Sequence, residues 1–296
     1  MTAKPVLQYP GSKMRLAQRI VDLLGPHTSY FEPYCGSAAV LLAKPRAAVE
    51  TIGDLSDLLI LFYRTLRDQR YDLVDAMVNT PYARKEFELA RQDDPALSAI
   101  ERSRRFMIRN NMAFVGSNGK GTWTATTRGS SGHSNATKWM NYTTRLSETG
   151  ERLAGVQIEN IDALELLARA VAANDPDIAV YLDPPYVMET RNGVIYQYDI
   201  EPAHHTAMLA LAVQLPGPTV VSGYQSSLYA DTLEGAGWTR IEVSTASSSS
   251  AGRGSVANRT EILWASPACV TPELPEPLEE VQDDHEAVDP ELPVAV

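Results

Sequence analysis

The order of its predicted elements assigns this chain of 296 residues to the α/β class. Short apolar runs of strand length alternate with segments of helical periodicity before residue 68 and again after residue 150. A polar side chain or a small-residue turn directly follows several of the strands, and ligands of open α/β sheets bind at that edge. We therefore expect an open sheet covered by helices and interrupted by an insert at 69–150.

A rigid polar turn follows a short buried strand predicted at 178–182. It consists of Asp183, Pro184, Pro185 and Tyr186, and because neither proline has an N–H, the turn is rich in acceptors. The Asp183 carboxylate and the Pro184 carbonyl can both accept hydrogen bonds from one NH₂ group, while Tyr186 offers a flat face for stacking. Such a turn suits the exocyclic amine of a planar heterocycle. The simpler alternative is a strand that ends beside a half-buried tyrosine.

The composition is ordinary for a soluble globular protein, with 44% hydrophobic and 21% charged residues. No apolar run is long enough to cross a bilayer, and the N-terminus has no signal-peptide core. The two cysteines, Cys35 and Cys269, argue against a disulfide scaffold, and the scattered histidines form no convincing metal-ligand set. We expect a cytoplasmic protein with no membrane partner and no metal.

The net charge of −11 is concentrated at one end of the chain. Residues 267–296 hold nine of the 37 acids and no Lys or Arg, which leaves 28 acids against 26 basic residues elsewhere. This segment is also rich in proline and lacks aromatic residues, so we predict a disordered acidic tail. Between Arg102 and Arg145 there are eight basic residues and no acid, which favours a polyanionic partner.

A tight loop at 9–13 precedes the first helix, which has apolar residues at helical spacing over 16–24. Ser12 can cap this helix, and Gly25 ends it. Viewed alone, Lys13 is more simply a surface lysine in the first turn.

Two strands with polar termini come next, at 30–33 and 48–52. The first leads into a small-residue turn at 35–38 and then a helix, so the backbone can approach a ligand closely at the helix N-terminus. Its single glycine does not favour a nicotinamide cofactor. Asp54 follows the second strand, 18 residues after that glycine, a spacing at which α/β folds bind ribose hydroxyls. The alternative for Asp54 is a capping acid before the next helix, for which Ser56 is also a candidate cap.

The insert at 69–150 reads as helical to about Ala113 and then as a long loop over 116–139 rich in Gly, Ser and Thr. Tryptophans among basic residues favour nucleic-acid contact, with a mobile solvated loop as the alternative. The α/β pattern resumes with strands at 156–159 and 219–222, helices at 163–173 and 203–215, and a hairpin of 239–243 with 261–265.

Five motifs stand in an order that resembles one known family. They are Tyr-Pro-Gly-Ser-Lys, Phe-Glu-Pro-Tyr-Cys-Gly, Gly-Asp-Leu-Ser, Asp-Pro-Pro-Tyr and Asn-Arg-Thr-Glu-Ile-Leu, with the basic insert before the fourth. This order resembles that of the Dam-type DNA adenine-N6 methyltransferases, the D12 class with α motif order. The resemblance covers about residues 6–266.

The resemblance implies a Rossmann-like methyltransferase fold with a recognition insert and S-adenosyl-L-methionine as methyl donor. It implies double-stranded DNA as partner, with the target base flipped out of the duplex, and leaves the oligomeric state open. It divides the chain into a catalytic domain (1–68 and 151–266), the insert (69–150) and the tail (267–296). The resemblance assigns catalysis to the turn Asp183, Pro184, Pro185 and Tyr186. It assigns cofactor binding to Tyr9, Lys13, Glu32, Pro33, Gly36, Asp54, Asp162 and Asp183. The candidates for DNA binding lie in the basic segment and are Arg109, Lys120, Trp123, Arg128 and Lys138.

Other functions share parts of this pattern. The same turn could serve methylation of RNA adenine or of cytosine N4, although Asp183 before Pro-Pro-Tyr resembles the adenine enzymes more. A nucleic-acid-binding protein that has lost catalysis is a third alternative, against which the intact turn and Asp54 argue.

Overall fold

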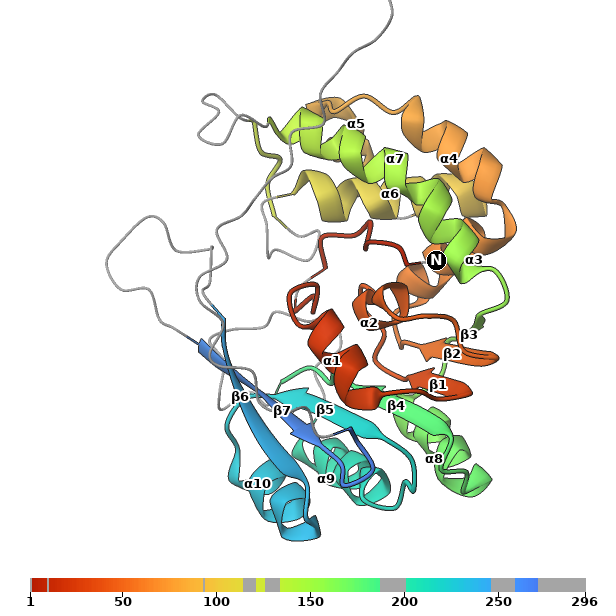
Figure 1. Ribbon diagram of the computed structural model, residues 1–296. Coiled ribbons are helices and arrows are strands. Elements are labelled where there is room, and N and C mark those ends of the chain that lie inside the picture. Colours follow the sequence, from red (N-terminus) through yellow and green to blue (C-terminus); the bar gives the residue numbers. More distant parts are fainter. Residues whose placement is uncertain are drawn as a thin grey trace, which may run out of the picture.

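The computed structural model describes residues 2–9, 11–92, 94–113, 121–125, 134–186, 201–245 and 259–270. Within these residues the chain forms one twisted sheet with helices on both faces and a further layer of helices above it (Figure 1).

The sheet has seven strands in the order β3-β2-β1-β4-β5-β7-β6. The first five strands in sequence pair in parallel, and the last two form an antiparallel hairpin at one edge. Strand order reverses between β1 and the central β4, which is where open α/β sheets bind ligands. The bounds are β1 Ser29–Glu32, β2 Val49–Gly53, β3 Gln157–Glu159, β4 Ile178–Leu182, β5 Thr219–Gly223, β6 Thr239–Thr245 and β7 Arg259–Ala265.

Every residue of β4 is buried, and its side chains alternate between two hydrophobic cores. Ala179 and Tyr181 belong to the core under α1 (Ala17–Leu24), α2 (Ala39–Ala43) and α3 (Asp57–Asp68). Ile178, Val180 and Leu182 belong to the opposite core, which α8 (Ala163–Ala173), α9 (Pro202–Ala212) and α10 (Ser227–Leu233) cover; the 3-10 turn η2 (Glu234–Ala236) follows α10. Burial on both faces explains why this strand is an uninterrupted apolar run in the sequence.

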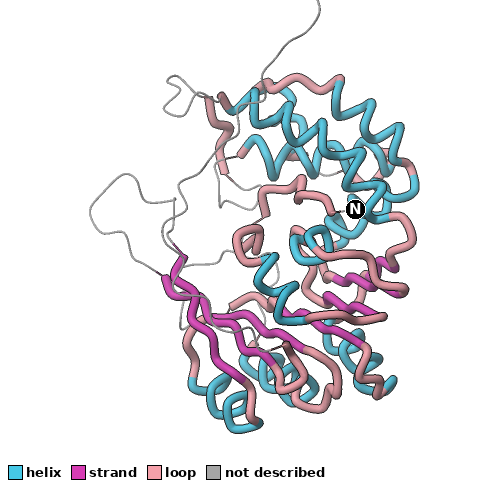
Figure 2. Tube along the Cα trace, in the orientation of Figure 1, coloured by secondary structure: helices cyan, strands magenta, loops and turns pink. Residues whose placement is uncertain are grey.

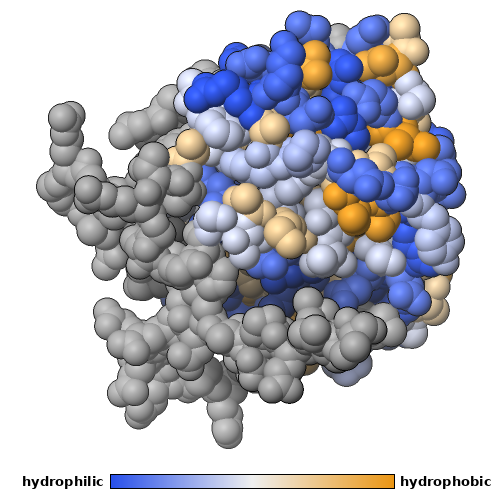
Figure 3. All heavy atoms as spheres, turned by 90° about the horizontal axis from the view of Figure 1, so that it is seen from above, coloured by the Kyte–Doolittle hydropathy of each residue, from blue (hydrophilic) through white to orange (hydrophobic). Residues whose placement is uncertain are grey.

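The insert contributes α4 (Arg70–Val78), α5 (Arg84–Ala90), α6 (Ala99–Met112) and α7 (Asn135–Leu153), which lie together as the upper layer in Figure 2. These helices share the core of α1 to α3. Arg152, almost at the end of α7, is buried and lies 2.6 Å from Glu50 of β2. The insert is thus packed directly onto the sheet domain. Seen from above, the described surface is mostly hydrophilic with isolated hydrophobic patches (Figure 3).

The expected α/β order is confirmed, but several local predictions are wrong. Helix α1 begins at Ala17, so Ser12 does not cap it; the Ser12 hydroxyl instead pairs with that of Ser37 at 2.8 Å. The loop expected to reach residue 139 ends at Ser134, whose side chain caps α7 by accepting from the N–H of Thr137. Helix α10 was not anticipated, because its seven residues are too few for a clear periodicity.

The tail expected from residue 267 does not begin there. The N–H of Val270 donates to the carbonyl of Leu23 at 2.9 Å, and Cys269 packs against the core. Val270 occupies the space that Gly25 leaves by having no side chain, since a Cβ there would come within 2.5 Å of it. The rest of the predicted tail, 271–296, lies outside the described residues.

Candidate active site

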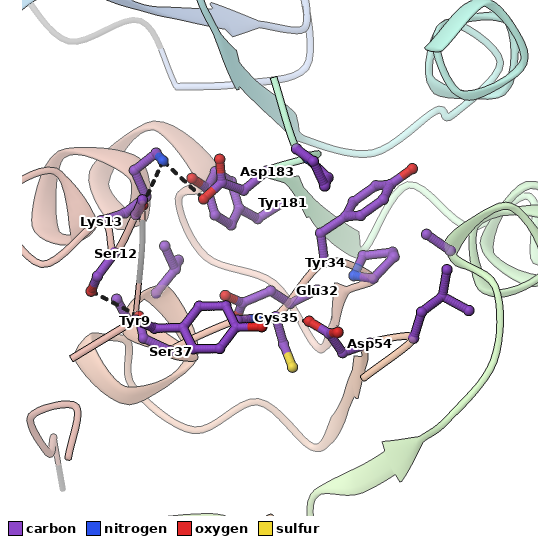
Figure 4. A pocket seen from close by; sticks show the side chains of 18 of the residues that line it. Tyr9, Ser12, Lys13, Glu32, Tyr34, Cys35, Ser37, Asp54, Tyr181 and Asp183 are labelled. Atoms are coloured by element: carbon purple, nitrogen blue, oxygen red, sulfur yellow. Dashed lines mark hydrogen bonds and ion pairs between the residues drawn. The ribbon is translucent and has the colours of Figure 1, made fainter. Parts of the chain in front are cut away.

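A pocket opens at the carboxyl ends of β1, β2 and β4, with about 830 Å³ of empty space including the solvent at its mouth. Lys13 and Asp183 point toward one another at one end, and Asp54 lies at the other (Figure 4). Most of the residues predicted for the cofactor line it, namely Tyr9, Lys13, Glu32, Pro33, Gly36, Asp54 and Asp183. Asp162 is absent from the lining; it caps α8 by accepting from the N–H of Leu164 at 2.7 Å.

Asp183 stands at the carboxyl end of the central strand, and both of its oxygens are engaged. Oδ1 accepts a hydrogen bond from the Ser222 hydroxyl at 3.0 Å, and Oδ2 lies 2.9 Å from Nζ of Lys13. Burial raises the pKa of Asp183, and the nearby ammonium of Lys13 acts in the opposite direction. Pro185 lines the pocket beside it.

Lys13 is buried, not a surface lysine. Its ammonium donates to the carbonyl of Gly11 at 2.7 Å and lies within 3.0 Å of two carboxylates, Asp183 and Glu261. A lysine is rarely buried unless it is paired, and here two acids pair with it.

The Tyr186 side chain is buried beside this cluster. Its hydroxyl donates to Oε1 of Glu261, the same oxygen that contacts Lys13. The ring lies 5.0 Å from Nζ of Lys13, and Tyr224 meets it edge to face with ring centroids 4.4 Å apart. Pro184 and Tyr186 are not among the residues that line this pocket.

The turn after β1 requires a glycine. Gly36 has a φ of 43°, and a Cβ at this position would come within 3.2 Å of the Tyr9 ring. The carbonyl of Gly36 accepts from the Tyr63 hydroxyl at 2.8 Å, which fixes the turn from the side of α3.

Asp54 connects this turn to the end of β2. Its carboxylate accepts hydrogen bonds from the N–H of Gly36 at 3.2 Å and from the N–H of Ser56 at 2.9 Å. It therefore holds the two turns together and also lines the pocket, whereas Ser56, at the N-cap position of α3, makes no side-chain cap hydrogen bond. Burial raises its pKa to about 6, against the opposing effect of these two N–H groups.

Glu32 is the most deeply buried acid of the pocket, with 2% of its surface exposed. It accepts from the Tyr30 hydroxyl at 2.9 Å and from the N–H of Leu41 at 3.1 Å. Burial raises its pKa to about 8 despite these donors. This carboxyl is protonated near neutral pH unless a cation approaches it.

Comparison with known proteins identifies the family. Residues 9–245 match the model of the D12 class N6 adenine-specific DNA methyltransferases. The chain belongs to this family. It is an enzyme that methylates the N6 position of adenine in DNA, as the resemblance of its motifs predicted, and its sheet is the Rossmann-like sheet of the methyltransferases.

Solved structures with similarity to the enzyme include two of the rRNA methyltransferase aviRa from Streptomyces viridochromogenes. The first is 16% identical, with a TM-score of 0.36, and the match covers 89% of this chain and 90% of that chain. The second is 17% identical, with a TM-score of 0.35, and the match covers 88% of this chain and 89% of that chain. Values this low support no conclusion about function. A search of curated proteins gave no match.

Several residues of the site were not predicted. Glu261 belongs to the last motif of the family order, in which the sequence indicates no role for a single residue, and Ser222 ends the apolar run of β5. Tyr34 and His204 line the pocket and are joined at 2.8 Å between the tyrosine hydroxyl and Nε2. Nothing in the sequence indicates this last pair, because Tyr34 comes from the turn after β1 and His204 from α9.

The basic segment of the insert carries less free charge than its sequence suggests. Arg104 pairs with Glu86 and Glu101, and Arg105 pairs with Glu101. Glu101 stands just before the acid-free segment, at the helical spacings i,i+3 and i,i+4 from these arginines.

The predicted DNA-binding residues occupy different environments. Lys138 is exposed on α7, and Arg109 is half-buried near the end of α6. Trp123 is half-buried between the Tyr82 ring, 5.7 Å away, and the guanidinium of Arg84, 4.6 Å away. The remaining two candidates, Lys120 and Arg128, lie outside the described residues. Among the described helices none is long and apolar enough to span a membrane.

Proposed function

We propose that the enzyme is cytoplasmic, takes its methyl group from S-adenosyl-L-methionine and transfers it to an adenine flipped out of double-stranded DNA. The observation that carries this proposal is that Asp183, at the end of β4, lines the same pocket as Glu32, Gly36 and Asp54. A target amine held at Asp183 is then adjacent to a donor held at the ends of β1 and β2.

The charge of the pocket fits this donor. S-adenosyl-L-methionine carries a sulfonium and an ammonium against one carboxylate, so it has one positive charge in excess. The described lining holds the carboxyl groups of Asp54 and Asp183, and that of Glu32, which can ionise when a cation binds, against the single ammonium of Lys13. Asp54 would accept from the ribose hydroxyls. Glu32 and the backbone of the Gly36 turn would hold the methionine portion. When bound, the donor supplies an electrophilic methyl group.

Asp183 and Pro184 would make the amine reactive. The lone pair of N6 is delocalised into the purine ring, so the amine is a poor nucleophile. Two acceptors on its hydrogens favour a pyramidal nitrogen, direct the lone pair toward the methyl carbon and stabilise the positive charge that develops as the N–C bond forms and the S–C bond breaks. Tyr186 would stack on the extruded base.

The experiment uses the full chain with donor labelled in the methyl group and, as substrates, duplex DNA, single-stranded DNA and RNA. Digestion to nucleosides and mass spectrometry should give N6-methyl-2′-deoxyadenosine, mainly from the duplex DNA. A product at cytosine N4, or a preference for RNA, would overturn the proposal. Calorimetry with the donor alone tests the donor assignment, and an enzyme that does not bind it would overturn that part of the proposal. Sequencing of modified bases after expression in a methylation-deficient host then gives the recognised site.

A further inference from the structure

We propose that Glu261 is a positioning residue for methyl transfer, because it retains Lys13 and orients Tyr186 so that Asp183 can accept the target amine. The proposal rests on the function proposed above and adds a residue from the far end of the chain to that site. Glu261 lies in β7, beyond the residues that the family model matches.

The ammonium of Lys13 is shared almost equally between two acids. Its Nζ is 2.9 Å from Asp183 and 3.0 Å from Glu261, and it also donates to the carbonyl of Gly11 at 2.7 Å. Only 4% of the Lys13 side chain is exposed, against 19% for Asp183 and 13% for Glu261. Water therefore cannot readily replace a lost carboxylate partner.

The target amine and Lys13 share the acceptor positions of Asp183. Each carboxylate oxygen can accept two hydrogen bonds; Oδ1 accepts one from Ser222 and Oδ2 lies against Lys13, so an ammonium drawn fully onto Asp183 takes acceptor positions and negative charge that the incoming NH₂ group needs. With Glu261 present, the ammonium can move off Asp183 and still keep one carboxylate and one carbonyl. Without that charge, Asp183 is the carboxylate partner of Lys13 that is left among the described residues, and the two stay together.

The same carboxylate also fixes the aromatic ring. Tyr186 donates its hydroxyl to Oε1 of Glu261, which holds the ring beside Asp183. The pairing of β7 with β6 sets this position, since Glu261 lies opposite Val243 in the antiparallel register. Glu261 thus connects the N-terminal lysine with the catalytic turn through one oxygen.

The test is a double-mutant cycle. Glu261→Gln keeps an acceptor for Tyr186 but removes the charge that retains Lys13, and Lys13→Met removes the group that is retained. Glu242→Gln is the matched control, because Glu242 lies on the neighbouring strand of the same hairpin and its side chain is 57% exposed. Single-turnover rates are measured at saturating donor, with the donor affinity and the melting temperature of each variant measured separately.

We expect Glu261→Gln to slow transfer about tenfold or more while donor affinity changes less than about threefold. In the Lys13→Met background the same change should have a much smaller effect, since there is no ammonium left to retain. The control should transfer at the wild-type rate. Additive effects in the cycle, or an unchanged rate in Glu261→Gln, would overturn the proposal.

A second readout does not depend on the rate. Duplexes of the recognised site carry either adenine or purine, which lacks the amine, at the methylated position. Wild type should bind the adenine duplex more tightly, and Glu261→Gln should lose this preference.

If Glu261→Gln does not fold, Glu261→Asp is used, which keeps the charge but withdraws it by one methylene and should also slow transfer. If the wild-type enzyme does not methylate adenine, the proposed function is refuted. If Glu261→Gln is active and still prefers the adenine duplex as wild type does, only the role of Glu261 is refuted.

Discussion

The backbone N–H of Gly36 donates a hydrogen bond of 3.2 Å to Oδ2 of Asp54, which joins the turn after β1 to the end of β2. The two residues are 18 positions apart, and the parallel pairing of β1 with β2 brings their strand ends together. Since the backbone of one and the carboxylate of the other line the same pocket, a change at Asp54 should alter both the ribose contact and the shape of the turn.

Donor binding should weaken as the pH falls through about 6, the pKa of Asp54 in the folded protein. The charged carboxylate accepts from hydroxyl groups more strongly than the protonated form, so affinity is highest above this pH. Asp54→Asn should bind the donor roughly 10- to 100-fold more weakly, the range for hydrogen bonds to a charged group. Calorimetry between pH 5 and 7 tests this, and an Asn variant that keeps the wild-type pH dependence would assign that dependence to another group.

Binding of the cationic donor should release a proton from Glu32 at pH 7.5. The buried carboxyl has a pKa raised to about 8, and a nearby positive charge favours its ionised form. The observed binding enthalpy should therefore differ between buffers of different ionisation enthalpy. Glu32→Gln should abolish that difference.

The same shift predicts a change in stability with pH. Because the pKa of Glu32 is higher in the folded than in the unfolded chain, its contribution to stability is complete below about pH 4.5 and is lost as the pH rises through about 8. The melting temperature of Glu32→Gln should fall less between pH 6 and pH 9 than that of wild type. Equal losses in the two proteins would contradict the raised pKa.

Asp183→Ala should reduce methyl transfer by a factor of at least about 10² to 10³, the loss expected for one acceptor or donor that stabilises the transition state. The protein should stay folded, because Lys13 keeps Glu261 as its carboxylate partner. Asp183→Asn should retain some activity, since its carbonyl can still accept from the amine. Wild-type turnover by the alanine variant would refute the assigned role.

The sequence predicted which residues lie together around the pocket, for a physical reason. Carboxyl ends of adjacent parallel strands meet at one edge of a sheet, so residues that follow apolar runs, such as Glu32, Asp54 and Asp183, lie around one pocket whatever the lengths of the connections. The position of Glu261 depends instead on the register of an antiparallel hairpin at the opposite edge. The alternation of apolar and polar residues along the two strands does not by itself fix that register.

Side-chain partners were harder to predict than strands. Trp139 was expected in a basic loop, yet it is buried in α7 and its indole N–H donates to the carbonyl of Thr80 at 2.8 Å. Arg104 was counted as a free cation, but an acid from α5, Glu86, pairs with it. Both contacts join segments that only the packing of the insert brings together.

Truncation after Val270 should leave the melting temperature and methyl transfer unchanged, whereas truncation after Ser266 should lower the melting temperature. The shorter chain loses the hydrogen bond from Val270 to Leu23 and the packing of Cys269. These contacts are worth about 1–2 kcal/mol, or roughly 2–8 °C in a chain of this size. Thermal melts of the two truncated proteins test this, and equal melting temperatures would show that residues 267–270 do not stabilise the fold.

Lys138 and Arg104 should respond differently to alanine substitution, although both belong to the same basic segment. Lys138 is exposed near the start of α7, so its ammonium can reach a phosphate. Its removal should weaken binding to all DNA sequences alike and reduce the slope of log affinity against log salt by about one unit. Arg104 is engaged with Glu86 and Glu101, so Arg104→Ala should lower the melting temperature and leave the salt slope unchanged.

The measurement is the affinity for duplex DNA at several salt concentrations, with the pattern of methylated sites as a second readout. A residue that reads a base would instead change which sites are methylated, at a cost of roughly 1–3 kcal/mol for one base position. If Lys138→Ala keeps the full salt slope, this face of α7 does not contact the backbone of DNA. A reduced slope in Arg104→Ala would show that its ion pairs open when DNA binds, because a cation that stays paired with acids releases no counterions.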